Sequence, residues 1–141
     1  MASRHLSVRL ADETFERLNT ESERSGLSRS QLAKTLLDEG LRMERHPGVV
    51  FRRGPAGRRP ALSSGPDIWE VIQILNHLES SGDELVRQTA DLAEIREDEV
   101  RTALQYYGEF PDEINEWIER AELQEAEMEE ALQRQQRILS R

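Results

Sequence analysis

The chain of 141 residues has no cysteine and no long apolar run. Without cysteine it forms no disulfide, has no thiol nucleophile and offers zinc no thiolate ligand, which fits a reducing cytoplasm. No stretch approaches the roughly 20 apolar residues that span a bilayer. The first ten residues alternate between polar and apolar side chains and lack the apolar core of a signal peptide. We therefore expect a cytoplasmic protein with no membrane partner.

Lysine is scarce as well, because Lys34 is the only lysine among 19 basic residues. Arginine suits bidentate contacts with phosphate and guanine, although a GC-rich genome also produces an arginine excess. The net charge is −9, and it is unevenly spread. Residues 1–65 carry a net charge of +4, whereas residues 66–141 carry −13. This division predicts two partners of opposite charge, with nucleic acid a candidate for the basic half only.

The groups that catalysis and cofactor binding require are also missing. The three histidines, His5, His46 and His77, lie in unrelated contexts, and none has the spacing of a zinc ligand set. No glycine-rich loop follows a strand, and no lysine sits in a phosphate-binding loop. No nucleophile has a base beside it. We expect neither an enzyme nor a cofactor, metal or small-molecule substrate.

Residues 5–10 alternate with the period of a β-strand. One side of this strand carries the apolar residues Leu6, Val8 and Leu10. The other side carries the polar residues His5, Ser7 and Arg9. From Asp12 the pattern becomes that of an amphipathic helix, which Gly26 is suited to end. Ser28 followed three residues later by Gln31 predicts a capping box that opens a second helix.

A strand of six residues is not stable alone, because its backbone groups need hydrogen-bond partners. No second strand is indicated before Pro47 and Gly48 end the second helix. The simplest partner is the same strand of a second copy, paired antiparallel with four helices packed behind. A two-stranded ribbon of this kind fits the major groove of B-DNA. The alternative is that residues 5–10 pair with the segment 49–62 in one mixed domain that does not contact DNA.

This pattern resembles the ribbon-helix-helix family, the Arc/MetJ-type repressors and related antitoxins. The likeness covers about a third of the chain and rests on the strand 5–10, the helix start at Asp12-Glu13, Gly26 and the second helix start at Ser28-Arg29-Ser30. It implies an intertwined homodimer on operator DNA. The base-reading positions it implies are His5, Ser7 and Arg9. The phosphate-contacting positions are Arg4, Ser28, Arg29 and Ser30, three of them at a helix N-terminus, which attracts anions.

Residues 47–66 are rich in arginine, glycine and proline, which indicates either a β-hairpin or an arginine-rich linker. Further helices are predicted from residues 66 or 67, from residue 83 and from residue 98. Residues 83–107 have a helix-turn-helix layout with a turn near residues 94–96. This stretch holds seven acidic and three basic side chains, so we expect DNA phosphates to repel it.

The stretch from residue 47 to residue 114 is similar to small bacterial domains found in antitoxins of the VapB kind. The likeness is carried by the segment Val-Arg-Thr-Ala-Leu-Gln-Tyr-Tyr at residues 100–107 and by Pro-Asp-Glu-Ile at residues 111–114. Such antitoxins are often paired with PIN-like ribonuclease toxins. The resemblance therefore implies a small protein toxin as the partner of the acidic half.

A last helix is predicted from about residue 112 to residue 139, with nine acidic and three basic side chains. It carries a weak heptad stripe of apolar residues. The candidate partner contacts on this helix are Trp117, Ile118, Met128 and Leu132. Two alternatives stay open: a coiled-coil or support helix, and a tail that is disordered until it is bound.

These patterns predict a mainly α fold with a short β element. The expected domains are a ribbon-helix-helix at residues 1–46, an arginine-rich hairpin or linker at 47–66 and an acidic helical bundle at 67–141. The expected function is a transcriptional autorepressor that acts as a type II antitoxin against a PIN-like ribonuclease. The alternatives are a stand-alone repressor or plasmid-partition-type DNA-binding protein, whose C-terminal half serves oligomerisation only, and a protein-interaction adaptor with no DNA role.

Overall fold

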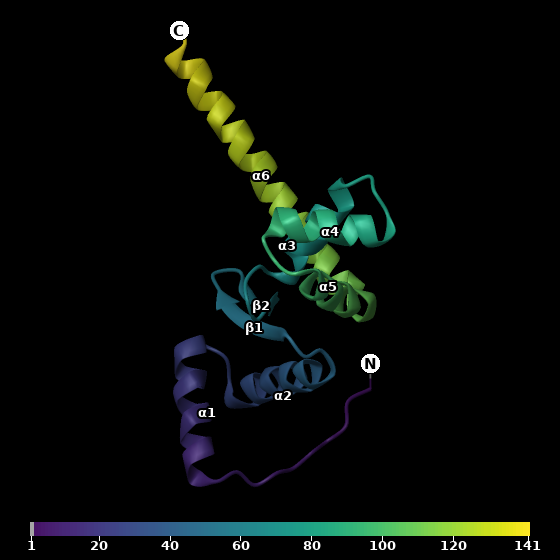
Figure 1. The fold of residues 1–141 in the computed structure, drawn as a ribbon. Helices are drawn as coiled ribbons and strands as arrows, with labels where there is room; N and C mark the ends of the chain where they lie inside the picture. Colours follow the sequence, from purple (N-terminus) through teal and green to yellow (C-terminus); the bar gives the residue numbers. More distant parts are fainter. Residues whose placement is uncertain (1) are drawn as a thin grey trace. The chain divides into compact units, whose positions relative to one another are not determined.

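The structure is a computed structural model that describes residues 2–141. The chain divides into two compact units, and the division falls between Glu44 and Arg45. Figure 1 traces the elements in chain order. Unit 1 contains the extended segment 2–11, helix α1 (Asp12–Ser25) and helix α2 (Arg29–Arg45), whose last residue belongs to unit 2. Unit 2 contains one β-hairpin followed by four helices.

The two helices of unit 1 begin and end where local sequence signals place them. Helix α1 ends at Gly26, which has a φ of 73° and donates its N–H to the carbonyl of Ser22 at 3.1 Å. Glycine occupies this left-handed position without the strain of a Cβ atom. The amide of Gln31 donates to Ser28 Oγ and the amide of Ser28 donates to Gln31 Oε1, both at 3.2 Å. The predicted capping box is confirmed.

Residues 2–10 form neither helix nor strand in the single chain. The strand predicted at residues 5–10 is therefore not formed here, since no segment of residues 2–141 offers it a ladder of hydrogen bonds. The alternative pairing of residues 5–10 with the segment 49–62 is wrong, because the two strands of that segment pair with each other. Unit 1 thus leaves the backbone of its extended segment without a sheet partner.

The segment 47–66 is a β-hairpin rather than a linker. Strand β1 (Val49–Gly54) pairs antiparallel with strand β2 (Gly57–Leu62), in a register that runs from Val49 opposite Leu62 to Gly54 opposite Gly57. Two residues, Pro55 and Ala56, form the turn, and Gly57 follows with a φ of 114°. Both Val49 and Leu62 are buried in the core of unit 2, so the open end of the hairpin is part of the helical unit.

The four remaining helices are α3 (Ile68–His77), α4 (Gly82–Ala93), α5 (Glu97–Glu109) and α6 (Pro111–Leu139). Helix α3 packs against each of the other three, and α4 packs against α5 (Figure 1). The turn predicted near residues 94–96 is confirmed, with Glu94 in the left-handed region at a φ of 57°. Proline occupies the first position of α6, where its missing N–H has no intrahelical acceptor to lose.

The core of unit 2 lies between the hairpin and the four helices. Tyr106 is its largest fully buried side chain. The other core members include Val49, Leu62, Ile68, Val71, Ile72, Val86, Val100, Ala103, Ile114 and Ile118. Tyr106 packs edge-on against His46 at 5.2 Å between ring centroids, and its hydroxyl donates to Glu113 Oε1 at 2.7 Å. This contact joins the start of unit 2 to the helices α5 and α6.

The C-terminal turns of α6 extend beyond the helices α3, α4 and α5 of the same unit (Figure 1). From residue 122 to residue 141 every residue is exposed except Ala131, which is half-buried. The predicted last helix is thus present, but only its first two turns are anchored in the core, through Ile114 and Ile118. No helix among the described residues combines the length and the apolar character needed to cross a lipid bilayer.

Candidate nucleic-acid interface

The extended N-terminal segment presents the side chains that the sequence assigns to base contacts. His5 Nε2 and Ser7 Oγ share a hydrogen bond of 2.9 Å, so these two residues lie on the same side of the segment, as the alternation requires. All of residues 2–10 are exposed. The apolar side chains between them are exposed as well, with Leu6 72%, Val8 68% and Leu10 43% accessible to solvent. Solvent-exposed leucine and valine in alternation are typical of a sheet face that lacks its cover.

Unit 1 also carries an apolar groove next to this segment. The groove has a volume of about 250 Å³. Leu10 forms part of its wall, together with Leu18 of α1 and Leu36 of α2. Further along α2, Leu37 and Leu41 are exposed. Of the four leucines of α2, only Leu32 is buried. Uncovered apolar side chains of unit 1 therefore lie on the extended segment and on both helices.

The N-terminus of α2 holds the second group of predicted contacts. The guanidinium of Arg29 lies over the ring of Phe15, 5.1 Å from its centroid, and its Nη1 donates to Asn19 Oδ1 at 3.3 Å. The first intrahelical bond runs from Leu32 N to Ser28 O, so the amides of Arg29 and Ser30 have no acceptor within the helix. A helix N-terminus whose first residue is an arginine suits an anion such as a phosphate. The supporting roles of Phe15 and Asn19 have no signal in the sequence.

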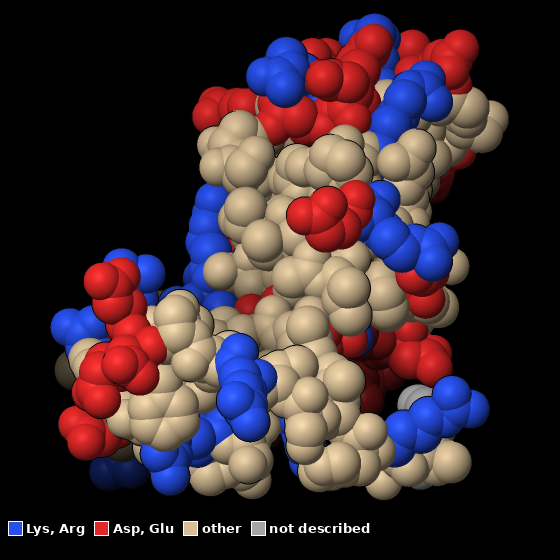
Figure 2. All heavy atoms as spheres, turned by 90° about the horizontal axis from the view of Figure 1, so that it is seen from below, with Lys and Arg blue, Asp and Glu red and all other residues tan. Residues whose placement is uncertain are grey.

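The net charge of the N-terminal part is different when the chain is divided at the boundary between the two units and not at residue 65. Residues 1–44 carry seven basic and eight acidic side chains, a net charge of −1, and residues 45–141 carry −8. The positive excess of residues 1–65 comes from Arg45 and from four arginines of the hairpin. On the face drawn in Figure 2, basic and acidic side chains are interspersed between uncharged areas. The net charge of unit 1 therefore does not by itself favour a polyanion, and the positions of its arginines matter instead.

The hairpin arginines are partly engaged within unit 2. Arg52 donates from Nη2 to the carbonyl of Leu62 at 2.9 Å and from Nη1 to the carbonyl of Gly65. Arg59 forms an ion pair with Asp67, which is buried at the N-terminus of α3. These bonds fasten the hairpin to the loop that leads into α3. They favour a structural role for Arg52 and Arg59.

The helix-turn-helix segment α4–α5 presents carboxylates where a DNA reader would present cations. Helix α5 opens with Glu97, Asp98 and Glu99. Arg96 binds Asp98 through Nε at 3.0 Å, and this hydrogen bond is the main cause that holds the pKa of the Asp98 carboxyl below its usual value. The amide of Arg96 donates to Glu99 Oε1 at 3.2 Å, which caps the helix. An acidic helix start raises the cost of approach to a phosphate backbone.

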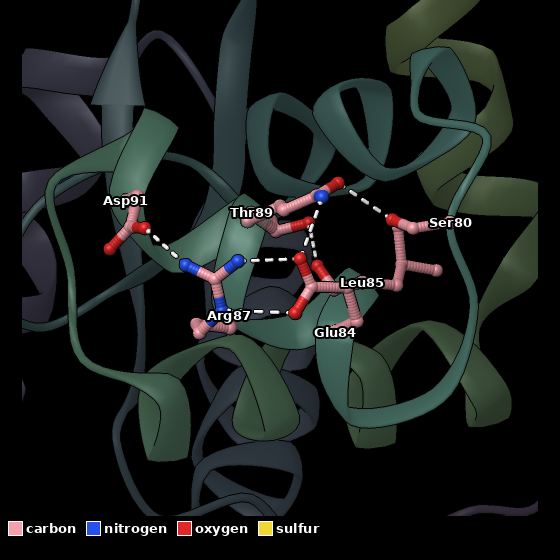
Figure 3. Close-up of polar contacts among 7 residues, drawn as sticks. Ser80, Glu84, Leu85, Arg87, Thr89 and Asp91 are labelled. Atoms are coloured by element: carbon pink, nitrogen blue, oxygen red, sulfur yellow. Dashed lines mark hydrogen bonds and ion pairs between the residues drawn. The ribbon is translucent and has the colours of Figure 1, made fainter.

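The arginine of α4 is also paired, as Figure 3 shows. Arg87 Nε donates to Glu84 Oε2 at 3.0 Å, and Arg87 Nη1 donates to Asp91 Oδ2 at 3.2 Å. Hydrogen bonds from Arg87 and then from Gln88 lower the pKa of the Glu84 carboxyl. Gln88 in turn accepts a bond from Ser80 Oγ at 2.7 Å, which ties the loop before α4 to the helix. This network stabilises α4 and leaves little free positive charge on it.

A second groove lies in unit 2 between the hairpin turn, the start of α3 and α6. It has a volume of about 620 Å³, and both tryptophans of the chain, Trp69 and Trp117, line it. The guanidinium of Arg120 lies 5.1 Å from the ring centroid of Trp117. Glu70 lines the groove as well, and its pKa is raised, first by burial and then by the charge of Asp67. Trp69 and Glu70 were not among the predicted contacts, because their spacing marks them only as the start of a helix.

The four residues predicted to bind a protein partner are separated by the fold. Trp117 is half-buried at the groove, whereas Met128 and Leu132 are exposed on the free turns of α6. Ile118 is only 7% exposed and belongs to the core. Ile118 is therefore removed from the candidate contact surface, because the heptad stripe that includes it passes from the core to solvent along the helix.

No group of three or more His, Asp or Glu side chains within residues 2–141 is arranged to hold a metal ion. The chain was also compared with models of protein families, with curated proteins and with solved structures. None of the three comparisons found a match.

Proposed function

We propose that the protein is a DNA-binding regulator of the ribbon-helix-helix type, built from two copies of the chain. The observation that carries this proposal is the uncovered apolar side of residues 5–10 beside the apolar groove of unit 1. An antiparallel partner strand satisfies the backbone of that segment. The helices of the second copy cover Leu6, Val8 and Leu10 from behind.

In such a dimer the polar sides of the two strands face outward together. His5, Ser7 and Arg9 of each copy then enter the major groove, where Arg9 suits a guanine edge and Ser7 suits either kind of base. Arg29 and the free amides at the start of α2 clamp the flanking phosphates on each side. The stacking of Arg29 on Phe15 fixes this arginine before DNA arrives.

The number of phosphates that the arginines neutralise sets the expected salt dependence. If Arg4 and Arg29 of both copies each neutralise one phosphate, four counterions are displaced. The logarithm of the binding constant then falls with the logarithm of salt concentration with a slope of about −3.6. A shallow slope with a strong sequence preference distinguishes this regulator from a general DNA-coating protein.

The test begins with selection of binding sites from randomised duplex DNA by the full-length chain. Fluorescence anisotropy on the selected site then compares three arginine variants. Arg9→Ala is expected to weaken binding to the selected site by roughly 1–3 kcal/mol and to relax its sequence preference. Arg29→Ala is expected to weaken binding to all sequences alike. Arg87→Ala in α4 is the control and should leave DNA binding unchanged.

Two results count against the proposal. Failure of the selection to enrich any sequence refutes specific DNA binding. A selected site that binds Arg9→Ala as tightly as the unaltered chain refutes the assignment of the strand.

A second role, neutralisation of a ribonuclease toxin, is favoured by the long free portion of α6. Residues 112–130 of this helix carry nine carboxylates and one arginine, and most of these side chains are exposed. A helix of this charge suits the substrate groove of a basic nuclease, where its carboxylates take the place of phosphates. Trp117 supplies a large aromatic anchor at its base.

The antitoxin role is tested with the full chain as bait in a lysate of the source organism. The expected partner is a small ribonuclease whose activity the chain inhibits at equal stoichiometry. Reversal of charge by Glu122→Lys and Glu129→Lys should abolish the inhibition and leave DNA binding intact. Capture of no inhibited ribonuclease leaves a stand-alone regulator, in which the C-terminal unit serves assembly alone.

A further inference from the structure

One face of α6 is free of charge from the core to the end of the helix. Successive residues of an α-helix are 100° apart, so residues at spacings of three and four share a face. On this face lie Ala121, Gln124, Met128, Ala131, Leu132, Gln135 and Leu139, called here the uncharged stripe. Met128 is 67%, Leu132 56% and Leu139 84% exposed. The glutamates and arginines of residues 121–139 lie at the sides of the stripe or on the opposite face of the helix.

The free portion of α6 lacks the tertiary packing that stabilises most helices in proteins. Residues 122–139 span about five turns, and all of them except Ala131 are exposed. Helices in proteins gain most of their stability from packing of an apolar face. The uncharged stripe is therefore expected to be covered when the helix is fully formed.

The distribution of charge along α6 indicates what covers it. Residues 112–130 carry nine acidic side chains and one basic one, whereas residues 131–141 carry three arginines and no acidic side chain. A parallel second copy places the acidic segments side by side, which is repulsive. An antiparallel second copy places the arginine-rich end of each helix beside the acidic segment of the other. Charge complementarity therefore favours a second copy in the antiparallel direction.

We propose that α6 pairs antiparallel with α6 of a second copy, stripe against stripe. The register that matches the stripe places Ala121 opposite Leu139 of the second copy and Met128 opposite its Leu132. Glu125, at the border of the stripe, then faces the amide of Gln135 in the other helix. The two-fold symmetry repeats this pair, and a polar residue at such a position is a known means of fixing the register of a coiled coil.

The same register brings opposite charges together at one flank. Glu127 lies beside Arg134 of the second copy, and the two-fold symmetry repeats this pair. The C-terminal turn of the second copy reaches the groove lined by Trp117 and Arg120. This contact goes beyond the N-terminal ribbon, because it is a second two-fold interface in the other unit of the chain. A protein partner that takes the same stripe has to displace it.

Cysteine cross-linking tests the direction of pairing, because the natural chain contains no cysteine. Ala121→Cys and Leu139→Cys are made in the full chain, one of them isotope-labelled, and are mixed in equal amounts before mild oxidation. We expect the mixed cross-link between residues 121 and 139 to dominate over either self-link. In a separate sample that is not oxidised, labelling by a maleimide confirms that both cysteines are reactive.

The matched control places a pair of cysteines on the opposite side of the helix. Glu119→Cys and Arg137→Cys have the same separation along the chain as the test pair, but lie away from the uncharged stripe. They should cross-link poorly when mixed. Dominant self-linking of Ala121→Cys contradicts the antiparallel direction.

Absence of any cross-link between reactive cysteines at residues 121 and 139 overturns self-pairing and leaves another protein as the occupant of the stripe. DNA binding of the same variants, measured in parallel, reports on the N-terminal ribbon alone. The failure of one proposal can thus be told apart from the failure of the other.

Discussion

Val8→Ala is expected to weaken the proposed dimer of the N-terminal segment on the order of 100-fold. Val8 is 68% exposed in the single chain, so most of its side chain is available for burial by a second copy. Replacement by alanine removes two methyl groups, each worth about 0.8 kcal/mol when buried. The two-fold axis doubles this loss to about 3 kcal/mol per dimer, which corresponds to roughly a 100-fold rise in the dissociation constant.

The matched control is the neighbouring residue on the other side of the segment. Ser7→Ala changes a side chain of similar size that faces outward in the proposed ribbon, so the dimer constant should change little. Both variants are measured by sedimentation equilibrium of the full chain. They carry Met128→Glu as well, which removes the proposed pairing of α6 from the measured mass.

The comparison between the two variants decides the result, because alternation is what separates them. Equal effects of Val8→Ala and Ser7→Ala indicate that the segment has no buried side. A dimer constant unchanged by Val8→Ala refutes the burial of this residue by a second copy. Either outcome removes the physical basis of the ribbon.

Three further predictions concern stability. Tyr106→Phe should lower the free energy of unfolding of unit 2 by about 1–2 kcal/mol, because it removes a buried hydroxyl that is bonded to a carboxylate. Tyr107→Phe should lower it by only about half as much. Unfolding in urea followed by tryptophan fluorescence measures both variants, since both tryptophans lie in unit 2. The bond to Arg87 lowers the pKa of Glu84, so its contribution to stability is present above the ordinary pKa of glutamate and is lost as the pH falls through the lower, folded-state pKa. Glu84→Gln should therefore lower the urea midpoint at neutral pH and have no effect in strong acid. Gly26→Ala should destabilise unit 1 by about 1 kcal/mol in thermal melts followed by circular dichroism, because its φ of 73° is strained for alanine.

The element boundaries were accessible from the sequence because the signals that set them are local. A left-handed glycine ends α1, a capping box opens α2, and Pro111 separates α5 from α6, although the structure includes this proline as the first residue of α6. The hairpin turn lies at the Gly-Pro-Ala-Gly segment for the same reason. Each of these depends on the conformational preference of one or two residues, which holds in any tertiary context.

The choice between two adjacent tyrosines was not accessible in this way. Spacings of three and four residues from Val100, Ala103 and Leu104 predict Tyr107 on the apolar face of this helix, whereas the structure buries Tyr106 completely and leaves Tyr107 half-buried. Spacings of three and four residues both occur on one helical face, so a shift by one residue fits the pattern equally well. Contact with His46 and Phe110, which the pattern does not encode, favours Tyr106.

Contacts between residues that are far apart in the chain could not be predicted from sequence patterns either. His46 Nε2 and Glu109 Oε2 lie 2.7 Å apart although 63 positions separate them in the chain. The groove between Trp69 and Trp117 arises in the same manner, from the packing of α3 beside α6. The candidate DNA contacts, which stay a prediction, were proposed from one short segment and one helix start alone.

The most direct test of the central claim is amide hydrogen exchange of residues 5–10, followed by NMR as the protein concentration rises. The full chain carries Met128→Glu in this experiment, which removes the proposed pairing of α6 from the measured dimer mass. The account predicts that alternate amides of this segment become protected with the same concentration dependence as the dimer mass, as the hydrogen-bond pattern of an antiparallel pair requires. Addition of the selected DNA should increase this protection. Unprotected amides at concentrations where the chain is dimeric would contradict the account, because the ribbon that it places in the major groove would then not exist.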